Sequence, residues 1–120
     1  MKRVIITGPT GAIGMALIRK YTEMEAEVTA VCRRGSRRIS RIPVSDRVRV
    51  VECSLDEMKT LPELLEGRYD VFIHLAWACT AGEGRNDTDA QTQNIKYTID
   101  AVEAAGRLGC TCFVGAGSQA

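Results

Sequence analysis

Three glycines, each three residues after the last, follow the first apolar run of the chain, in the stretch TGPTGAIG at 7–14. Because glycine has no Cβ, Gly8 permits a tight turn, Gly11 lets the backbone approach a pyrophosphate, and Gly14 allows a helix to pack closely on a strand. A helix that begins at this turn would offer unpaired N–H groups and partial positive charge to phosphates. The spacing is GxxGxxG rather than GxGxxG, and no P-loop lysine follows. The stretch therefore favours dinucleotide binding over nucleoside triphosphate hydrolysis, although three glycines can also build a purely structural turn.

The elements that must position this turn are expected to be strands alternating with helices. Short, apolar, β-branched runs predict five strands, at 3–7, 27–32, 47–53, 70–77 and 110–117. Helical segments are expected after the glycines, at 56–67, where Pro62 interrupts the pattern, and at 87–108, where Gly109 is a stop signal. Strands alternating with helices imply right-handed βαβ units. The sequence thus predicts an α/β fold with a doubly wound parallel sheet, a Rossmann fold truncated after about five strands.

Apolar residues at helical spacing predict which helix faces lie against the sheet. After the glycines, one stripe is formed by Ile13, Leu17, Tyr21 and Met24. In the long helix, Ile95, Ile99 and Val102 fall on one face. We expect both stripes to be buried.

Composition and charge limit the classes of protein to consider. The 120 residues suit one domain, and 45% hydrophobic with 26% charged residues is typical of an ordinary globular chain. With 16 basic and 15 acidic residues there is no overall field for nucleic acid or a membrane. The stretch MKRVIITG is too short for a signal peptide, which predicts a cytoplasmic protein. Five cysteines without a CxxC pair favour reduced thiols over a disulfide scaffold or a zinc site.

Four motifs, in this order, give the chain a resemblance to a known family. TGPTGAIG resembles the TGxxGxxG signature of the extended short-chain dehydrogenases/reductases, the branch of NAD(P)-dependent epimerases and dehydratases. HLAW at 74–77 resembles its HxAA motif, NIKYTIDAVEAA at 94–105 its NVxGTxNLLEAA helix, and FVGAGSQA at 113–120 its fifth strand, which ends at the catalytic serine. The resemblance covers the whole chain. It implies an NAD(P)-binding Rossmann domain at 1–120 that lacks the C-terminal substrate-binding part.

The residues after the second predicted strand bear on the choice of cofactor. In dinucleotide folds this strand normally ends in an acidic residue that binds the adenosine ribose hydroxyls. Cys32 holds that place, and Arg33 and Arg34 follow it, so a 2′-phosphate is the better partner. We therefore expect NADP, with NAD as the alternative. Three further arginines, Arg37, Arg38 and Arg41, are interpreted as a solvated loop too far along to touch the same phosphate, or alternatively as a grip on a second anion or nucleic acid.

The resemblance also implies roles for individual residues. Ser54 stands where the family usually has an Asp near the adenine, and its hydroxyl would bind more weakly than a carboxylate. Trp77 replaces a small residue and either narrows the pocket, stacks on a ligand or is merely structural. Asn94 resembles a cofactor-side Asn, with an N-cap as the competing role, and His74, the sole histidine, is expected to be a satisfied core residue. The implied cofactor-binding set is Gly8, Thr10, Gly11, Ala12, Ile13, Gly14, Arg33, Arg34, Ser54, Leu55, Leu75, Ala76, Trp77 and Asn94.

The catalytic residues implied by the family are only partly present. Ser118 matches the serine that binds the reacting oxygen, but none of the three tyrosines, Tyr21, Tyr69 and Tyr97, is followed four residues later by a lysine. The family's YxxxK pair comes some two dozen residues after the serine. We therefore expect the chain to bind dinucleotide without turning over substrate, and its open sheet edge to be covered by missing residues or by a homodimer partner.

Three functions from different classes remain open. The first is the cofactor-binding part of an NAD(P)-dependent epimerase, dehydratase or reductase acting on a nucleotide-linked sugar. The second is a noncatalytic NADP-binding sensor that regulates a partner. The third, a nucleic-acid-binding module that uses the arginine loop, predicts steeply salt-dependent binding, and near-neutral charge and few aromatic residues count against it. The first is the expected function, with no nucleic-acid or membrane partner.

Overall fold

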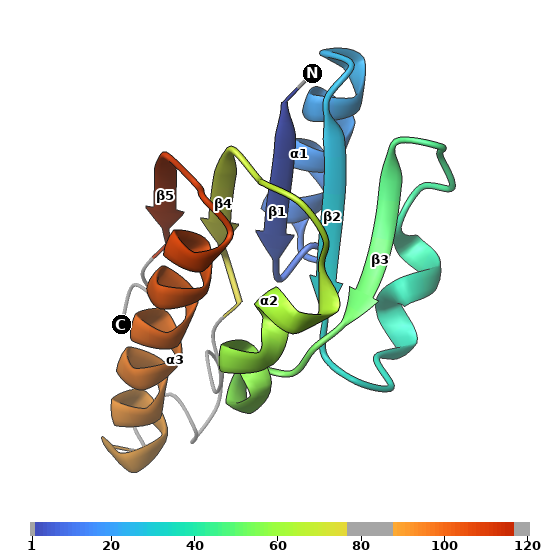
Figure 1. Cartoon of the computed structure of the whole chain (residues 1–120). Coiled ribbons are helices and arrows are strands. Elements are labelled where there is room, and N and C mark those ends of the chain that lie inside the picture. Colours follow the sequence, from blue (N-terminus) through green and yellow to red (C-terminus); the bar gives the residue numbers. More distant parts are fainter. Residues whose placement is uncertain (1, 77–87, 117–120) are drawn as a thin grey trace.

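A five-stranded, all-parallel sheet forms the centre of the protein (Figure 1). The computed structural model describes residues 2–76 and 88–116. The strands lie in the order β3-β2-β1-β4-β5, so the chain builds outwards from β1 first to one side and then to the other. The strands are β1 (Arg3–Thr7), β2 (Glu27–Cys32), β3 (Val48–Glu52), β4 (Val71–His74) and β5 (Cys112–Gly115). The predicted doubly wound parallel sheet is confirmed.

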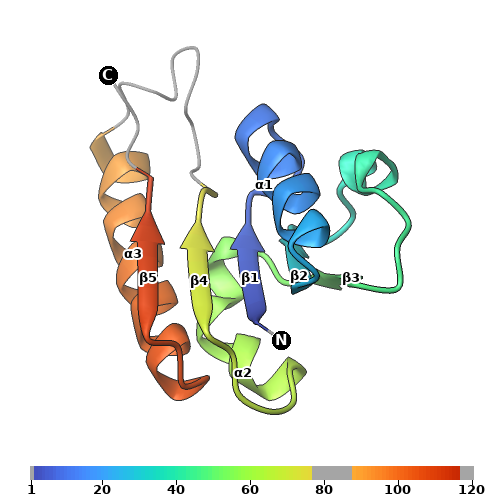
Figure 2. The same cartoon turned by 90° about the horizontal axis from the view of Figure 1, so that it is seen from above.

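Helices cover both faces of this sheet (Figures 1 and 2). They are α1 (Ala12–Glu23), α2 (Leu61–Leu64), α3 (Thr88–Arg107) and two 3₁₀ segments, η1 (Arg37–Arg41) and η2 (Leu55–Thr60). Alternate residues of β1 point to opposite faces: Val4 and Ile6 pack in the α1 layer, and Ile5 in the layer with η2, α2 and α3. Burial on both faces explains the unbroken apolar run of this strand.

Three of the predicted strands are shorter than expected. β3, β4 and β5 cover Val48–Glu52, Val71–His74 and Cys112–Gly115, whereas strands were expected at 47–53, 70–77 and 110–117. At the end of β4 the Leu75 amide donates to the Thr7 carbonyl oxygen at 3.2 Å and to the Thr7 Oγ1 at 3.1 Å, whereas the Ala76 amide donates to the Oγ1 alone, at 3.2 Å. The chain therefore leaves the sheet at the carboxyl end of β4.

The predicted buried face of α1 is wrong at both of its ends. Ile13 and Met24 are 65% and 59% exposed, and the buried line runs through Gly14 and Ile18. Gly14 packs closely on the glycine turn, because a Cβ there would lie 2.6 Å from the Pro9 Cα. The helix α1 thus approaches the turn closely at a glycine, a residue that a hydrophobicity pattern does not count as apolar.

The predicted buried face of α3 is also wrong. Ile95, Ile99 and Val102 are 59%, 53% and 48% exposed. The side of α3 that lies on the sheet instead carries Asn94, Ala101, Ala104, Ala105 and Leu108, all buried. Small alanines let the helix approach the sheet closely, and the larger aliphatic side chains face away from it.

The segment expected to be one interrupted helix at 56–67 consists of η2 followed by α2. Pro62 lies in the first turn of α2, where its missing N–H leaves no hydrogen bond unmade. Met58 of η2 and Leu61 of α2 are buried. Within the described part of the chain no helix is both long and apolar enough to cross a membrane.

The sheet is open at β5, which pairs only with β4 among the described strands. Val114 on this strand is 48% exposed. The homodimer that was expected to cover the edge stays a prediction.

Candidate functional site

A cavity of about 700 Å³ opens at the carboxyl ends of β1, β2 and β4. This is the place where ligands bind in open α/β sheets, at the point where the strand order reverses. Its walls come from the turn after β1, the ends of β2 and β4, the segment into η1 and the start of η2. The lining residues are Thr7, Gly8, Pro9, Thr10, Gly11, Val31, Cys32, Arg33, Ser36, Arg38, Cys53, Leu55, Met58, Leu75 and Ala76.

The three glycines of the turn differ in their surroundings. Gly8 has φ +66°, and a Cβ there would lie 2.8 Å from the Ala76 nitrogen, so only glycine fits between the two strand ends. Gly14 lies under the turn, against Pro9. Gly11 is open: the nearest atom to a Cβ there is the Gly8 carbonyl oxygen, 4.0 Å away. The one glycine of the three with free space around it therefore faces the cavity.

The start of α1 suits an anion. Gly11 is the N-cap, and no side chain caps the helix end. There is also no acidic residue in the first turn. The free N–H groups and the partial positive charge of the helix end are thus left for a ligand.

Two arginines line the cavity beyond β2. Arg33 follows Cys32 directly, and Arg38 returns to the cavity because Ser36 caps η1, its Oγ accepting from the Arg38 amide at 3.3 Å. Arg38 thus lines the same cavity as Arg33, because a 3₁₀ turn shortens the path, and the expectation that it lies too far along to touch the same phosphate stays a prediction. Arg37 and Arg41 are exposed and do not line the cavity, in keeping with a solvated segment.

Arg34 is directed elsewhere. Its Nε donates to the Glu57 carboxylate at 2.6 Å, and this partner lowers the pKa of Glu57. The Arg34 amide donates to the Ser54 Oγ at 3.1 Å. Neither Arg34 nor Ser54 lines the cavity. The two residues join the end of β2 to η2 and so shape the rim.

The far wall of the cavity is apolar. Leu55 and Met58 of η2 and Cys53 after β3 lie there. Burial raises the pKa of the Cys32 and Cys53 thiols, so both are protonated and weakly nucleophilic at neutral pH. Such a surface suits a flat apolar ring system better than a charged group. The four described cysteines, Cys32, Cys53, Cys110 and Cys112, are free.

Seven of the fourteen residues in the predicted cofactor-binding set line this cavity: Gly8, Thr10, Gly11, Arg33, Leu55, Leu75 and Ala76. Ala12, Ile13, Gly14, Arg34, Ser54 and Asn94 do not line it. Asn94 is buried on the sheet side of α3. Trp77 and Ser118 lie outside the described residues.

Several lining residues were missed by the sequence reasoning. Ser36 and Arg38 were missed because their place depends on the η1 turn, for which the serine before RRISR was the available signal as an N-cap. Cys53 and Met58 were missed because apolar residues after a strand look the same whether they face a core or a cavity.

His74 is buried, as expected, but it is not fully satisfied. Its Nδ1 lies 2.8 Å from the Thr7 Oγ1, and its ring contacts Phe113, with the centroids 6.3 Å apart. Its Nε2 is buried without a hydrogen-bond partner among the described residues. Burial lowers the pKa of His74 from 6.5 to about 4, so the ring is neutral at pH 7.

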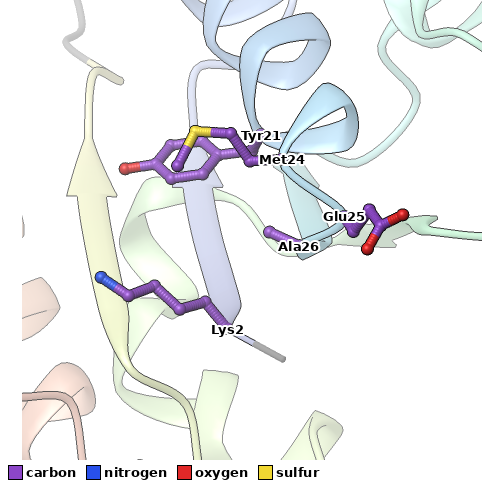
Figure 3. Close-up of a pocket in the computed structure, with 5 residues that line it drawn as sticks. All are labelled: Lys2, Tyr21, Met24, Glu25 and Ala26. Carbon is purple, nitrogen blue, oxygen red and sulfur yellow. The ribbon is translucent and has the colours of Figure 1, made fainter.

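A second, smaller hollow of about 250 Å³ lies at the opposite end of the sheet (Figure 3). Lys2, Tyr21, Met24, Glu25 and Ala26 line it. Figure 3 shows the Glu25 carboxylate directed away from the Lys2 and Tyr21 side chains, so the charged groups do not converge on one ligand. We therefore assign the ligand site to the larger cavity.

Comparisons with known proteins show that this fold is shared with solved structures. Among the solved structures, an epimerase from Methanothermobacter thermautotrophicus superposes with a TM-score of 0.78 at 22% identity, covering 95% of this chain and 34% of that chain. WbmG from Bordetella bronchiseptica, in complex with NAD and UDP, has a TM-score of 0.76 at 18% identity, over 93% and 36% of the two chains. MoeE5, in complex with UDP-glucuronic acid and NAD, has 0.74 at 23% identity, over 94% and 36%.

The chain thus spans about a third of the length of these structures. No curated protein matches its sequence. A family model does match, over residues 4–120, which is nearly the whole chain. With the glycine turn, the sheet order and the cavity in the places described above, this match shows that the chain belongs to the NAD dependent epimerase/dehydratase family.

Proposed function

We propose that this chain binds a nicotinamide dinucleotide, NADP in preference to NAD, in the cavity at the carboxyl ends of β1, β2 and β4. One observation carries the proposal: a single cavity joins the glycine turn at the start of α1 to Arg33 and Arg38 beyond β2. A dinucleotide presents a pyrophosphate and, in NADP, a 2′-phosphate at the adenosine ribose. The two ends of the cavity offer groups that bind these two anions.

The residues present fit such a cofactor. Gly11 leaves open space at the uncapped start of α1, where a pyrophosphate would bind to backbone N–H groups. Leu55 and Met58 offer an apolar wall to the adenine. A bound nicotinamide supplies hydride transfer to or from a substrate. The residues described here bind and orient the dinucleotide.

The preference for NADP rests on charge. No acidic residue lines the described cavity, and the place of the usual ribose-binding carboxylate is held by Cys32. Arg33 and Arg38 are the charged residues that line it. Guanidinium groups pair with phosphate through strong, charge-assisted hydrogen bonds.

We further propose that the chain is the dinucleotide-binding portion of an enzyme that acts on a nucleotide-linked sugar. The family and the complexes of WbmG with NAD and UDP and of MoeE5 with UDP-glucuronic acid and NAD support this substrate class. By itself the chain binds cofactor without turnover, because none of its tyrosines lines the cavity. The same observation favours a second candidate, a noncatalytic NADP-binding regulatory protein.

Calorimetric titration with NADPH and with NADH tests the binding and the preference for the phosphorylated cofactor. A hydrogen bond to a charged group contributes about 1.5–3 kcal/mol, which is roughly 10-fold or more in affinity. We expect Arg33→Ala and Arg38→Ala each to lower NADPH affinity by about 10-fold and to change NADH affinity by less than about 3-fold. Arg34→Ala should have a smaller effect than Arg33→Ala, because Glu57 already engages Arg34.

Arg41→Ala is the matched control, since Arg41 belongs to η1, as Arg38 does, but does not line the cavity. It should leave both affinities unchanged. Equal losses for NADPH and NADH in the Arg33 and Arg38 variants would contradict the preference. Failure of either cofactor to bind the unmodified chain at millimolar concentration would contradict the proposed function itself.

A further inference from the structure

The Thr7 hydroxyl joins three segments of the chain at the floor of the cavity. Its Oγ1 accepts from the Leu75 amide at 3.1 Å and from the Ala76 amide at 3.2 Å. The same atom lies 2.8 Å from the His74 Nδ1. Thr7 is buried at the end of β1, and the next residue, Gly8, begins the glycine turn. The Thr7 hydroxyl, together with the Thr7 carbonyl oxygen that accepts from the Leu75 amide at 3.2 Å, therefore holds the end of β4 against the start of the turn.

The hydrogen-bond capacity of a hydroxyl fixes the direction of its third bond. A hydroxyl has one donor hydrogen and two acceptor lone pairs. The Leu75 and Ala76 amides are both donors, so the hydroxyl hydrogen is directed to His74, whose Nδ1 accepts it. The opposite tautomer would place three N–H donors on one oxygen and leave the Thr7 O–H without an acceptor among the described residues. The Leu75 amide also donates to the Thr7 carbonyl oxygen at 3.2 Å, but the need of the Thr7 O–H for an acceptor still favours the tautomer of His74 with its proton on Nε2.

This tautomer lowers the stability of the fold, because it leaves a buried N–H group unsatisfied. The Nε2–H is buried without a partner among the described residues, and an unsatisfied buried donor costs about 1–3 kcal/mol. Burial also lowers the pKa of His74 to about 4, which keeps the ring neutral and its Nδ1 lone pair free at pH 7. An apolar residue in the same place beside Phe113 would avoid the unsatisfied N–H, but it would leave the buried Thr7 O–H without this acceptor.

The end of β4 that this bond holds is tightly fitted against the turn. A Cβ at Gly8 would lie 2.8 Å from the Ala76 nitrogen and 2.9 Å from the Leu75 carbonyl carbon. Gly8, Leu75 and Ala76 all line the cavity. A small shift of the Leu75–Ala76 backbone would thus change the shape of the cavity at the turn.

We propose that His74 is a positioning residue for the dinucleotide cavity. Its Nδ1 accepts the Thr7 hydroxyl hydrogen and so directs both lone pairs of Thr7 Oγ1 to the amides of Leu75 and Ala76. This holds the end of β4 against the Gly8 turn. The proposal rests on the proposed function, since the ligand of the cavity is taken to be the dinucleotide.

The sole histidine makes a direct test possible, because the ¹⁵N NMR signals of its ring need no assignment. We expect the free, unmodified chain at pH 7 to show the Nε2–H tautomer. We also expect His74→Leu, which has no acceptor, to lower NADPH affinity by about 10-fold with little net change in the free energy of unfolding, because the unsatisfied Nε2–H is removed while the buried Thr7 O–H loses its acceptor. His74→Asn, whose side-chain oxygen can accept from Thr7, should restore the affinity to within about 3-fold.

A second pair of variants covers the case in which His74→Leu does not fold. Thr7→Val, which has no hydroxyl, should lose the same affinity, and Thr7→Ser should retain it. The Nδ1–H tautomer, or equal NADPH affinities for the variants with and without the hydrogen bond, would overturn the positioning role. An unmodified chain that binds no dinucleotide would instead overturn the proposed function, and the ring signals would still report the direction of the Thr7–His74 bond.

Discussion

Adjacent residues of one loop take different roles at the end of β2. Arg33 lines the cavity, whereas Arg34 is paired with Glu57, 23 residues further along the chain. From the sequence, both Arg33 and Arg34 were expected to bind a 2′-phosphate, and nothing in the sequence distinguished one from the other. That distinction depends on where η2 places Glu57, which is a tertiary contact and not a local pattern.

The buried His74 predicts a pH dependence of stability. Its pKa is about 4 in the folded chain and 6.5 without burial. Above pH 6.5 the ring is neutral in both states, and the stability is fully present. As the pH falls from 6.5 towards 4, the unfolded chain takes up a proton that the folded chain does not, so the free energy of unfolding falls, by about 3 kcal/mol in total.

Urea denaturation of the unmodified chain and of His74→Asn between pH 7 and pH 4.5 measures this effect. Asparagine does not titrate, and the carboxylates common to both chains cancel in the difference. We expect the unmodified chain to lose about 2–3 kcal/mol more than the variant over this range. Parallel curves for the two proteins would show that His74 is not buried as described.

At the scale of the elements, the strands were more predictable than the faces of the helices. The run Val4–Ile6 consists of β-branched apolar residues, which is typical of a strand buried on both faces, and all three residues are buried. A strand could therefore be predicted here from the residue types alone. The faces of α1 and α3 were predicted from large aliphatic residues, yet the close contacts are made by Gly14 against the glycine turn and by Ala101 and its neighbours against the sheet. A hydrophobicity pattern counts large side chains, whereas close packing selects small ones.

The contact at Gly14 gives a prediction for the packing of α1. In most helix interiors Gly→Ala is stabilising, but a Cβ here would lie 2.6 Å from the Pro9 Cα and 2.7 Å from the Gly8 carbonyl oxygen. Both atoms belong to the backbone and cannot rotate away. We expect Gly14→Ala to lower the free energy of unfolding by about 1–3 kcal/mol, measured by thermal or urea unfolding.

Gly106→Ala in the last turn of α3 is the matched control. A Cβ there meets no atom within 4 Å. It should leave stability unchanged or raise it by roughly 0.5–1 kcal/mol. If the two alanine variants proved equally stable, the close packing of α1 on the glycine turn would be wrong.

At the scale of the whole molecule, the order of the strands places the site. Because the chain builds outwards from β1 in both directions, the segments after β1 and β4 diverge, and a cavity is left between them. This architecture was predictable from the alternation of strands and helices and from the glycine turn. The return of Arg38 to the cavity was not, since it depends on a short 3₁₀ turn capped by Ser36.

The described residues line a hollow at each end of the sheet, and we assign the dinucleotide to the larger of these two. Titration of the ¹⁵N-labelled chain with NADPH, monitored by amide chemical shifts, locates the bound dinucleotide. We expect the largest changes at Gly8, Gly11, Arg33 and Ser36, with none at Tyr21 and its neighbours in the hollow of Figure 3. Changes centred on that hollow, or no changes at millimolar NADPH, would contradict dinucleotide binding at the carboxyl ends of β1, β2 and β4.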